Sequence, residues 1–321
     1  MCGRCACTRQ PHELQSACAF KPEAIGKTVA MPKWASSSLT YYPSYNIPPQ
    51  SATPVLVSGY QPHLKSSIEE HSAQESGERV LQTMKWGLIP HWHKAPNDLP
   101  LLNNCRSDGM MEKVSFKNAV QKGQRCVVIA DGYFEWQQQR GNQKQPFFIY
   151  FAQNGPTAEM TELTSVLPAL SDKQDGPLKP FSPPFTGRLL TMAGLFDSWR
   201  PPSQSVSELI TVDAHPSVHH IHDRMPAILD GEEEVSRWLC PNNATSEVLD
   251  LIRPCGTLAW HTVSRAVSNV RNKTSECVLP IDTSKQVSSK QNTLLNWFSR
   301  AQKASNDDPS SEQALKKPRL F

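Results

Sequence analysis

The sequence is poor in glycine, has no long apolar run and carries almost no net charge. Its 321 residues include 15 glycines against 27 prolines, a proline content well above that of an average chain. Abundant proline predicts long stretches of loop or extended chain rather than helix. No apolar run approaches the roughly 18 residues that a membrane-spanning helix needs, so no membrane partner is expected.

The cysteines do not form a disulfide framework. They number nine, which is odd, and their spacing is irregular. The amino terminus has no basic stretch followed by an apolar run, the pattern of a secretory signal. A reducing compartment, the cytosol or the nucleus, is therefore predicted. A chain of this length can bury a core without covalent staples.

The net charge of +3 is not spread evenly. Residues 286–321 hold six basic and three acidic groups, which is the whole of that excess. The first 285 residues are electrically balanced. If they bind a polyanion, their basic side chains must gather on one face.

The apolar patterning predicts an α+β fold dominated by strands. Short runs rich in β-branched and aromatic residues predict strands at 54–58, 125–131, 146–151, 189–196 and 209–213. Helical periodicity predicts helices at 11–20, 115–122, 231–239 and 245–252.

One domain, residues 2–284, is predicted to precede a tail. Two segments within it, 61–79 and 153–187, are polar or rich in proline and lack periodicity, so we expect surface insertions there. From residue 285 onward Ser, Lys, Gln and Asp dominate. Residues 285–321 are therefore predicted to be disordered.

Cys2 has the most distinctive chemistry in the chain. An initiator methionine before a small residue is normally removed, so the mature chain is expected to begin with Cys2. Its α-amine and thiol, with ordinary pKa values of about 8 and about 8.5, lie on adjacent carbons. The amine can form a Schiff base with an aldehyde. The thiolate can then close a five-membered thiazolidine ring, favoured by its high effective concentration.

Two simpler interpretations of this terminus stay open. In one, Met1 is retained or Cys2 is only an exposed terminal thiol, as at many loose chain ends. In the other, Cys2, Cys5 and Cys7 form half of a zinc knuckle. No matching pair of ligands follows at finger spacing, which disfavours a metal.

Five further segments follow the opening Cys-Gly-Arg in a fixed order. They read SYNIPP at 44–49, KWGLIP at 85–90, NNCRS at 103–107, DGYFEW at 131–136 and HDRMPAIL at 222–229. Together they resemble the SRAP family of abasic-site processing proteins, and the resemblance covers residues 2–281 apart from the two insertions. It implies a single SRAP-type domain, monomeric and without a cofactor, that captures the ring-opened aldehyde of an abasic site in single-stranded DNA.

The resemblance also implies four catalytic residues. Their roles are the crosslinking nucleophile for Cys2, orientation of the sugar or the amino terminus for Asn104, proton transfer for Glu135, and assistance to formation and reversal of the Schiff base for His222. The residue types suit the reaction, because dehydrating a carbinolamine needs a proton donor and a proton acceptor. A buried carboxyl and an imidazole both titrate near neutral pH.

Each proton-transfer residue has an ordinary alternative. Glu135 also suits a salt-bridged surface carboxylate at the end of a strand. His222 lies within eight residues of His215, His219 and His220, which together suggest a metal cluster. The i, i+4 pair in this cluster encloses a proline and lacks the glutamate of a zinc-protease helix, so no metal site is expected.

Basic and aromatic side chains of the same segments are expected to hold DNA. The predicted phosphate contacts are Arg4, Lys85, Arg106 and Arg224, and the predicted base-stacking faces are Tyr45, Trp86 and Trp136. A tryptophan in a β-rich protein also packs well into a core, so both indoles have two interpretations. The segments that carry Arg4 and Arg106 place them beside Cys2 and Asn104.

The order of the aromatic residues in DGYFEW is the reverse of the Phe-Tyr order expected of the family. The swap keeps two rings but moves a hydroxyl across the strand. It leaves the assignment of Glu135 intact and leaves open what a tyrosine hydroxyl does here.

The tail contains one interaction motif. Its spacing of a glutamine, an aliphatic residue and two aromatic residues is typical of the box that binds the replication sliding clamp (PCNA), here Gln291, Leu294, Trp297 and Phe298. The same spacing suits one face of an ordinary packed helix. Isolated aromatics in a polar tail favour the clamp. The basic cluster at 316–319 suggests the nucleus.

These features predict a nuclear protein, on chromatin at replication forks, that crosslinks itself to abasic sites and shields them from cleavage. Two other classes stay open. An N-terminal-nucleophile hydrolase would use the same thiol and amine on an amide, and its milder form is a peptidase that removes Met1. A non-covalent reader of modified DNA bases would make Cys2 incidental and would release DNA fully in salt.

Overall fold

The computed structural model describes residues 2–21, 29–60, 78–87, 103–152, 187–198 and 205–281. Met1–Pro280 forms one compact unit. Most of both predicted insertions, and the whole segment from Gln291 to Phe298, lie outside the described residues. Among those described, no helix is long and apolar enough to cross a membrane.

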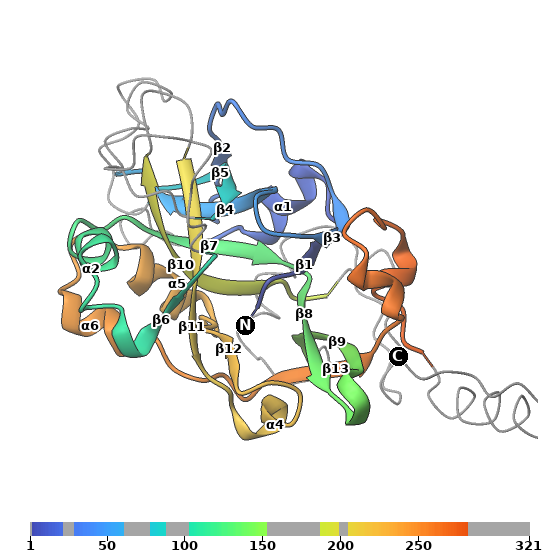
Figure 1. Ribbon diagram of the computed structural model, residues 1–321. Coiled ribbons are helices and arrows are strands. Elements are labelled where there is room, and N and C mark those ends of the chain that lie inside the picture. Colours follow the sequence, from blue (N-terminus) through green and yellow to red (C-terminus); the bar gives the residue numbers. More distant parts are fainter. Residues whose placement is uncertain are drawn as a thin grey trace, which may run out of the picture. The chain divides into compact units, whose positions relative to one another are not determined.

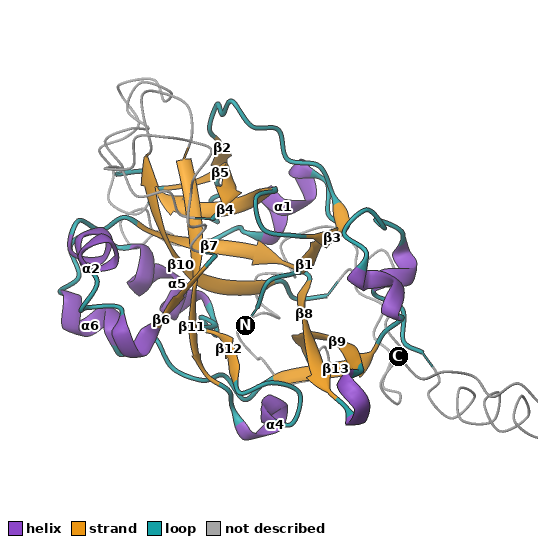
Figure 2. Cartoon of the chain, in the orientation of Figure 1, coloured by secondary structure: helices purple, strands orange, loops and turns teal. Residues whose placement is uncertain are grey.

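The larger of two β-sheets runs in the order β12-β11-β10-β7-β4-β5-β2, with β6 beside β11. Figures 1 and 2 show how strands dominate the compact unit. The strands of this sheet are β2 (Lys33–Trp34), β4 (Ala52–Ser58), β5 (Arg79–Trp86), β6 (Asn104–Arg106), β7 (Arg125–Ala130), β10 (Leu190–Ser198), β11 (Ser205–Asp213) and β12 (Arg224–Pro226).

Five strands of this sheet close on themselves. Antiparallel pairing links β5, β4, β7, β10 and β11 in that order. A parallel pairing between β5 and β11, with Trp86 opposite Ser207, completes the ring. The result is a small barrel, in which closure removes free strand edges.

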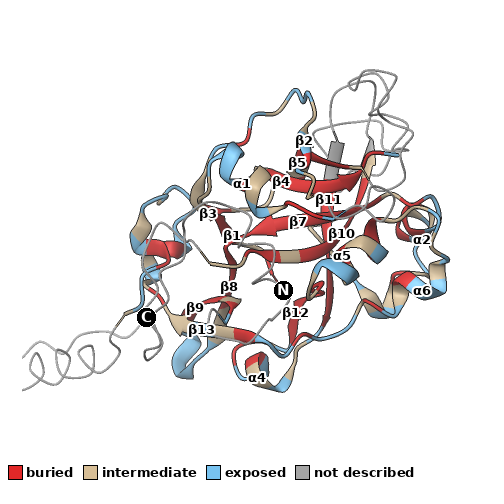
Figure 3. Cartoon of the chain, turned by 180° about the vertical axis from the view of Figure 1, so that it is seen from behind, coloured by how far each residue is buried: buried red, intermediate tan, exposed pale blue. Residues whose placement is uncertain are grey.

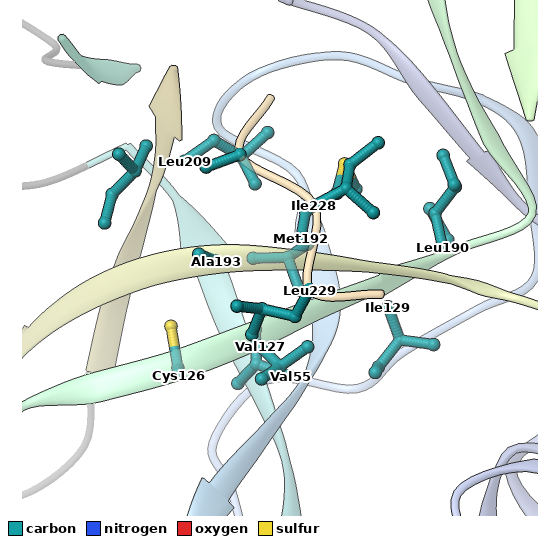
Figure 4. Packing of buried hydrophobic residues seen from close by; sticks show 14 of the residues in the cluster. Val55, Cys126, Val127, Ile129, Leu190, Met192, Ala193, Leu209, Ile228 and Leu229 are labelled. Carbon is teal, nitrogen blue, oxygen red and sulfur yellow. The ribbon is translucent and has the colours of Figure 1, made fainter. Parts of the chain in front are cut away.

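The barrel strands bury aliphatic side chains on both faces. Val55 and Met192, each opposite Val128, lie on one face and Val127 on the other, and all three are wholly buried in the cluster of Figure 4. The outer side of β7 is covered by α5 (Glu232–Leu239), whose Trp238 donates from Nε1 to the carbonyl of Cys126 at 2.9 Å. Because both faces of β7 are covered, its sequence is a continuous apolar run rather than an alternating one.

The second sheet is antiparallel and has the order β13-β9-β8-β1-β3. Its strands are β1 (Cys5–Cys7), β3 (Ser44–Ile47), β8 (Gly132–Gln138), β9 (Lys144–Phe151) and β13 (Leu258–Thr262). One face is closed by a small apolar cluster of Ala6, Phe134, Phe148, Val263, Val267, Cys277 and Val278. Since side chains alternate along a strand, Tyr133 and Glu135 lie on the opposite face of β8.

Asp131 joins the barrel to the second sheet, between the end of β7 and the start of β8. Its carboxylate accepts hydrogen bonds from the backbone N–H of Thr8 at 2.7 Å and from Thr8 Oγ1 at 2.6 Å. These bonds fix the amino-terminal strand beside β8. Gly132 follows because a Cβ there would lie 2.5 Å from the ring of Phe148.

The helices are short and lie outside the sheets. They are α1 (Pro11–Ala17), α2 (Val114–Gln121), α4 (Pro216–His219), α5 and α6 (Thr245–Leu249), with 3-10 turns η2 (Ser107–Gly109), η3 (Arg140–Asn142), η4 (Arg265–Ser268) and η5 (Ser275–Cys277). Figure 3 shows that the strands carry most of the buried residues, whereas the helices expose their outer sides.

The predicted α+β class with dominant strands is confirmed. Each predicted strand and helix has a counterpart, although α1 ends at Ala17 and α6 at Leu249, earlier than expected. The sequence analysis missed the short strands β1, β2, β3, β6 and β12, and also β5, β8 and β13.

Arg79, the last residue of the first predicted insertion, is instead the first residue of β5. The side chain is 6% exposed, donates from Nη1 to Glu232 Oε2 at 3.0 Å and lies 4.4 Å over the ring of Phe20. Contacts between distant segments let an arginine occupy a buried strand. Local patterning does not reveal such contacts.

Candidate active site at the amino terminus

Cys2 is held between the two sheets. It is wholly buried just before β1, and Asn104 Nδ2 donates to its carbonyl oxygen at 2.8 Å. Asn104 begins β6, which is fixed to the barrel by pairing with Leu209 of β11. Views from both sides place the start of the chain between the barrel strands and β8. The interpretation of Cys2 as an exposed terminal thiol is therefore wrong.

Glu135 approaches Cys2 from the second sheet. The pairing of Cys5 with Tyr133 and the bond from Phe134 N–H to the Arg4 carbonyl at 2.9 Å align β8 with the residues that follow Cys2. The Glu135 side chain is 3% exposed, which rules out a surface carboxylate.

Electrostatics link the two groups. Burial raises the pKa of Glu135 to about 7, against a smaller lowering by the positive charge of the amino terminus. Burial and, after it, the negative charge of Glu135 raise the pKa of the Cys2 thiol. A carboxyl that titrates near neutral pH beside this thiol can both give and take a proton.

His222 enters from the loop between α4 and β12. Its Nδ1 accepts from the Arg224 backbone N–H at 3.0 Å and lies 2.8 Å from Asp223 Oδ1. The first contact suits the neutral imidazole and the second suits the imidazolium, so both forms have a partner. Burial lowers the pKa of His222, and the charge of the amino terminus contributes in the same direction. An imidazole with a partner for each protonation state can both give and take a proton.

Two buried polar atoms near Cys2 have no hydrogen-bond partner among the described residues. They are Asn104 Oδ1 and the hydroxyl of Tyr133, whose side chain is wholly buried. Leaving such atoms unpaired costs free energy, so they are suited to a ligand or a water molecule. The sequence analysis did not select Tyr133. The period-two alternation from Glu135 is the signal that would have found it.

Arg4 is packed inward. Its Nη1 donates to Asn46 Oδ1 and to the Val267 carbonyl, both at 2.8 Å, and its guanidinium lies 5.6 Å from the ring centroid of Trp136. Trp136 in turn donates from Nε1 to Ser268 Oγ at 3.1 Å. The structure thus ties both residues to the segment that closes the far face of the second sheet.

Arg106 and Arg224 share one acidic neighbour. The exposed Arg106 makes two bonds to Asp108, from Nε at 3.1 Å and from Nη2 at 2.7 Å, and this pairing lowers the pKa of Asp108 to about 2. Arg224 is 5% exposed; its Nη2 lies 3.4 Å from Asp108 Oδ1, and its Nη1 donates to Asp213 at 2.6 Å. A phosphate at this place would meet Arg106 at the surface.

The three remaining predicted DNA contacts are Trp86, Tyr45 and Lys85. Trp86 is 2% exposed within the barrel core and donates from Nε1 to the Asn103 carbonyl at 3.0 Å, so its ring presents no open face. Tyr45 is half-buried and packs against the small apolar cluster. Lys85 is half-buried near the end of β5. Their roles in DNA binding stay predictions.

Within the described ranges, no three His, Cys, Asp or Glu side chains are arranged to hold a metal ion. Cys2 and Cys5 belong to the core, and Cys7 Sγ accepts from the Tyr41 hydroxyl at 3.1 Å. The side chains gathered around Cys2 are those of a thiol, an amide, a carboxyl and an imidazole.

Residues 1–270 match the protein family described as SOS response associated peptidase (SRAP). The chain is 40% identical over 336 residues to abasic site processing protein HMCES of Xenopus tropicalis. This alignment covers 100% of this chain and 90% of the Xenopus protein. It is 41% identical over 320 residues to HMCES of Gallus gallus, with coverage of 95% and 86%.

More distant proteins are similar as well. Abasic site processing protein YedK of Escherichia coli (strain K12) is 29% identical over 205 residues, which is 63% of this chain and 75% of YedK. A crystal structure of a protein from Bacteroides thetaiotaomicron has the same fold, with a TM-score of 0.59 at 20% identity, and covers 88% of this chain and 100% of its own.

Proposed function

The chain belongs to the SOS response associated peptidase (SRAP) family, and from this we propose that it processes abasic sites in DNA by covalent capture through Cys2. Its similar relatives are named abasic site processing proteins. The observation that carries the proposal is the hydrogen bond from the Asn104 amide to the Cys2 carbonyl, beside the buried carboxyl of Glu135.

The reaction begins with removal of Met1, which frees the α-amine of Cys2. This nitrogen attacks the aldehyde carbon of the ring-opened deoxyribose, and the carbinolamine loses water to give a Schiff base. The Cys2 sulfur then adds to the same carbon while its proton passes to the nitrogen, which closes the thiazolidine. One water molecule is released overall.

Glu135 and His222 supply the proton transfers. With a pKa of about 7, Glu135 is present in both protonation states at neutral pH, so it can protonate the departing hydroxyl and accept a proton from the amine. His222, whose pKa is lowered mainly by burial, acts as a neutral base. Because each step is reversible, the same groups also open the crosslink slowly.

We place this activity on single-stranded DNA at replication forks, where a covalent cap shields the abasic site from strand cleavage. The clamp-binding motif, including Gln291 and Trp297, would deliver the protein to PCNA, and the basic cluster at 316–319 would direct it to the nucleus. These segments lie outside the described residues, so this part of the proposal is supported by sequence alone.

The direct test mixes mature protein with single-stranded DNA that bears one abasic site. We expect an adduct on a denaturing gel, with an intact mass equal to protein plus DNA minus one water. Cys2→Ala should abolish it, whereas Cys240→Ala, which removes a thiol outside the site, should not. An adduct on protein that retains Met1, or equal affinity for intact and abasic strands with complete release in salt, would overturn the proposal.

A self-processing peptidase is a second activity of the same site, favoured by the family's description. The bond broken would be that between Met1 and Cys2, with water as co-reactant. Protein translated while methionine aminopeptidase is inhibited should lose Met1 on incubation, and Glu135→Gln should keep it. If the intact mass stays unchanged, this activity is absent.

A further inference from the structure

Trp260 lies on the same face of the second sheet as Glu135. In an antiparallel pair, directly opposed residues point their side chains to one face. Glu135 is opposite Phe147, Tyr133 is opposite Ile149, and Ile149 is opposite Trp260. The alternation along β8 puts Tyr133 and Glu135 on one side, so Trp260 shares that side with the proposed active site.

A series of rings links the two proton-transfer residues. Phe147 and Trp260 meet edge to face with centroids 5.5 Å apart, and the Trp260 ring lies 4.7 Å from that of His220. His220 is two residues before His222 on the loop after α4. The rings therefore begin beside Glu135 and end on the loop that carries His222.

The two outer rings of this series, Trp260 and His220, are exposed to solvent and fixed by contacts with the sheet. Trp260 is 42% exposed, whereas Phe147 beneath it is 6% exposed. The His220 ring is exposed as well, and its carbonyl accepts from Gln137 Nε2 of β8 at 2.9 Å. A large aromatic surface that is fixed from two sides, and not covered by described residues, suits a flat partner.

Basic side chains lie in the hairpin between β8 and β9. Lys144 begins β9 and is near enough that its charge adds to burial in lowering the pKa of His222. Arg140 lies in the turn before it. Aromatic faces next to basic side chains are the usual means of holding single-stranded nucleic acid.

We propose that Trp260 and His220 form a shelf on which the unpaired base next to the abasic nucleotide stacks. The inference rests on the proposed function, since it takes the abasic sugar to lie at Cys2. Stacking is tolerant of base identity, because every base has a π-face. The shelf would therefore orient the damaged strand without selecting its sequence.

Binding is tested with an unreactive strand. The probe is a single-stranded oligonucleotide with a tetrahydrofuran in place of the abasic nucleotide, and its Kd is measured by fluorescence anisotropy. Trp260→Ala should raise the Kd about ten-fold, Trp260→Phe should raise it less than about three-fold, and His220→Ala should fall between them. Tyr42→Ala, which removes a ring that is 74% exposed elsewhere, should leave the Kd unchanged.

A second probe identifies the stacked base. In it, the nucleotide on one side of the tetrahydrofuran also lacks its base. Removing the base that stacks should raise the Kd of the wild type about ten-fold. The same removal should not raise the Kd of Trp260→Ala any further. Two results would show that the shelf does not bind a base. In one, removing either flanking base leaves the Kd of the wild type unchanged. In the other, removing the base raises the Kd of Trp260→Ala as much as that of the wild type.

Crosslinking to a reactive abasic site separates this inference from the proposed function. Trp260→Ala should need about ten-fold more DNA for half-maximal rate while its maximal rate stays that of wild type. A wild type that forms no adduct contradicts covalent capture, but the unreactive probes still test the shelf. Thermal melting of each variant shows whether it is folded. If Trp260→Ala does not fold, the Kd values of Trp260→Phe and His220→Ala test the shelf.

Discussion

Asn46 and Asn104 both hold the amino-terminal segment, but their surroundings differ. Asn46 Nδ2 lies 2.8 to 3.1 Å from three backbone carbonyls within residues 267–272, and its Oδ1 accepts from Arg4. Asn104 donates one bond to Cys2, and its buried Oδ1 has no partner in the part of the chain that the structure describes.

The difference distinguishes a region whose polar atoms are paired within the protein from one that still has polar atoms for a ligand. Around Asn46 every polar atom of the amide is used by the protein, which is what a structural tie requires. Around Asn104 the described residues leave one amide oxygen without a partner, although a buried polar atom without a partner destabilises the fold. Two further pairs repeat the pattern. The Tyr41 hydroxyl has backbone partners and Tyr133 has none described, and Arg79 pairs with Glu232 while both oxygens of Glu208 lack a described partner.

The largest expected effect is on stability at Asn46. Asn46→Ala removes a buried amide that contacts Arg4 and three backbone carbonyls, and the Asn269 and Asn272 carbonyls lose this donor, which should lower the free energy of unfolding by about 4 kcal/mol. Urea denaturation measures it. Asn243→Ala, which removes a single exposed bond of 2.8 Å to Arg237, should cost less than about 1 kcal/mol. Equal losses in the two variants would contradict the comparison.

At Asn104 the expected loss is in rate. Asn104→Ala frees the Cys2 carbonyl and should slow adduct formation about 100-fold, which corresponds to about 2.7 kcal/mol in the barrier. Its unfolding free energy should change by less than about 1 kcal/mol, because only one bond is lost. Single-turnover crosslinking and urea denaturation measure the two quantities. A variant as unstable as Asn46→Ala but with normal rate would reverse the roles of the two asparagines.

Glu208 gives a pH-dependent effect of intermediate size. Burial raises its pKa to about 9, so the folded protein keeps the proton that the unfolded chain releases above about pH 4.5. Its contribution to stability is therefore full below pH 4.5 and falls as pH rises toward 9. Glu208→Gln should be more stable than wild type by on the order of 2 kcal/mol at pH 7. The gain should disappear near pH 4.5; a gain that is constant with pH would show that ionisation is not its cause.

The smallest expected effect distinguishes the two tyrosines. Tyr133→Phe removes a buried hydroxyl without a described partner and should stabilise the protein by about 1 kcal/mol, whereas Tyr41→Phe should destabilise it by a similar amount. Thermal melting of both variants gives the sign. If Tyr133→Phe is instead destabilised, its hydroxyl is bound in the free protein and is not reserved for a ligand.

The sequence was sufficient where a signal is local. Continuous apolar runs predicted β4, β7 and β10, and the ordered motifs identified the family. The place of Arg79 and the short strands could not be predicted. An arginine in a buried strand depends on contacts with Glu232 and Phe20, which are far away in the chain. Tyr133 was not predicted as a site residue for a related reason. Its neighbours become visible only when β8 lies between β1 and β9.

By itself, the sequence determined the chemistry: a thiol and an amine on adjacent carbons once Met1 is removed, with an amide, a carboxyl and an imidazole in motifs of fixed order. The tertiary structure decided which of these groups meet and in what state of protonation. A pKa depends on burial and on charges from distant segments, so Glu135 acquires a pKa of about 7 only when the second sheet closes over it. The exposed ring of Trp260 has the same origin, because strand pairing and not sequence distance brings it beside the site.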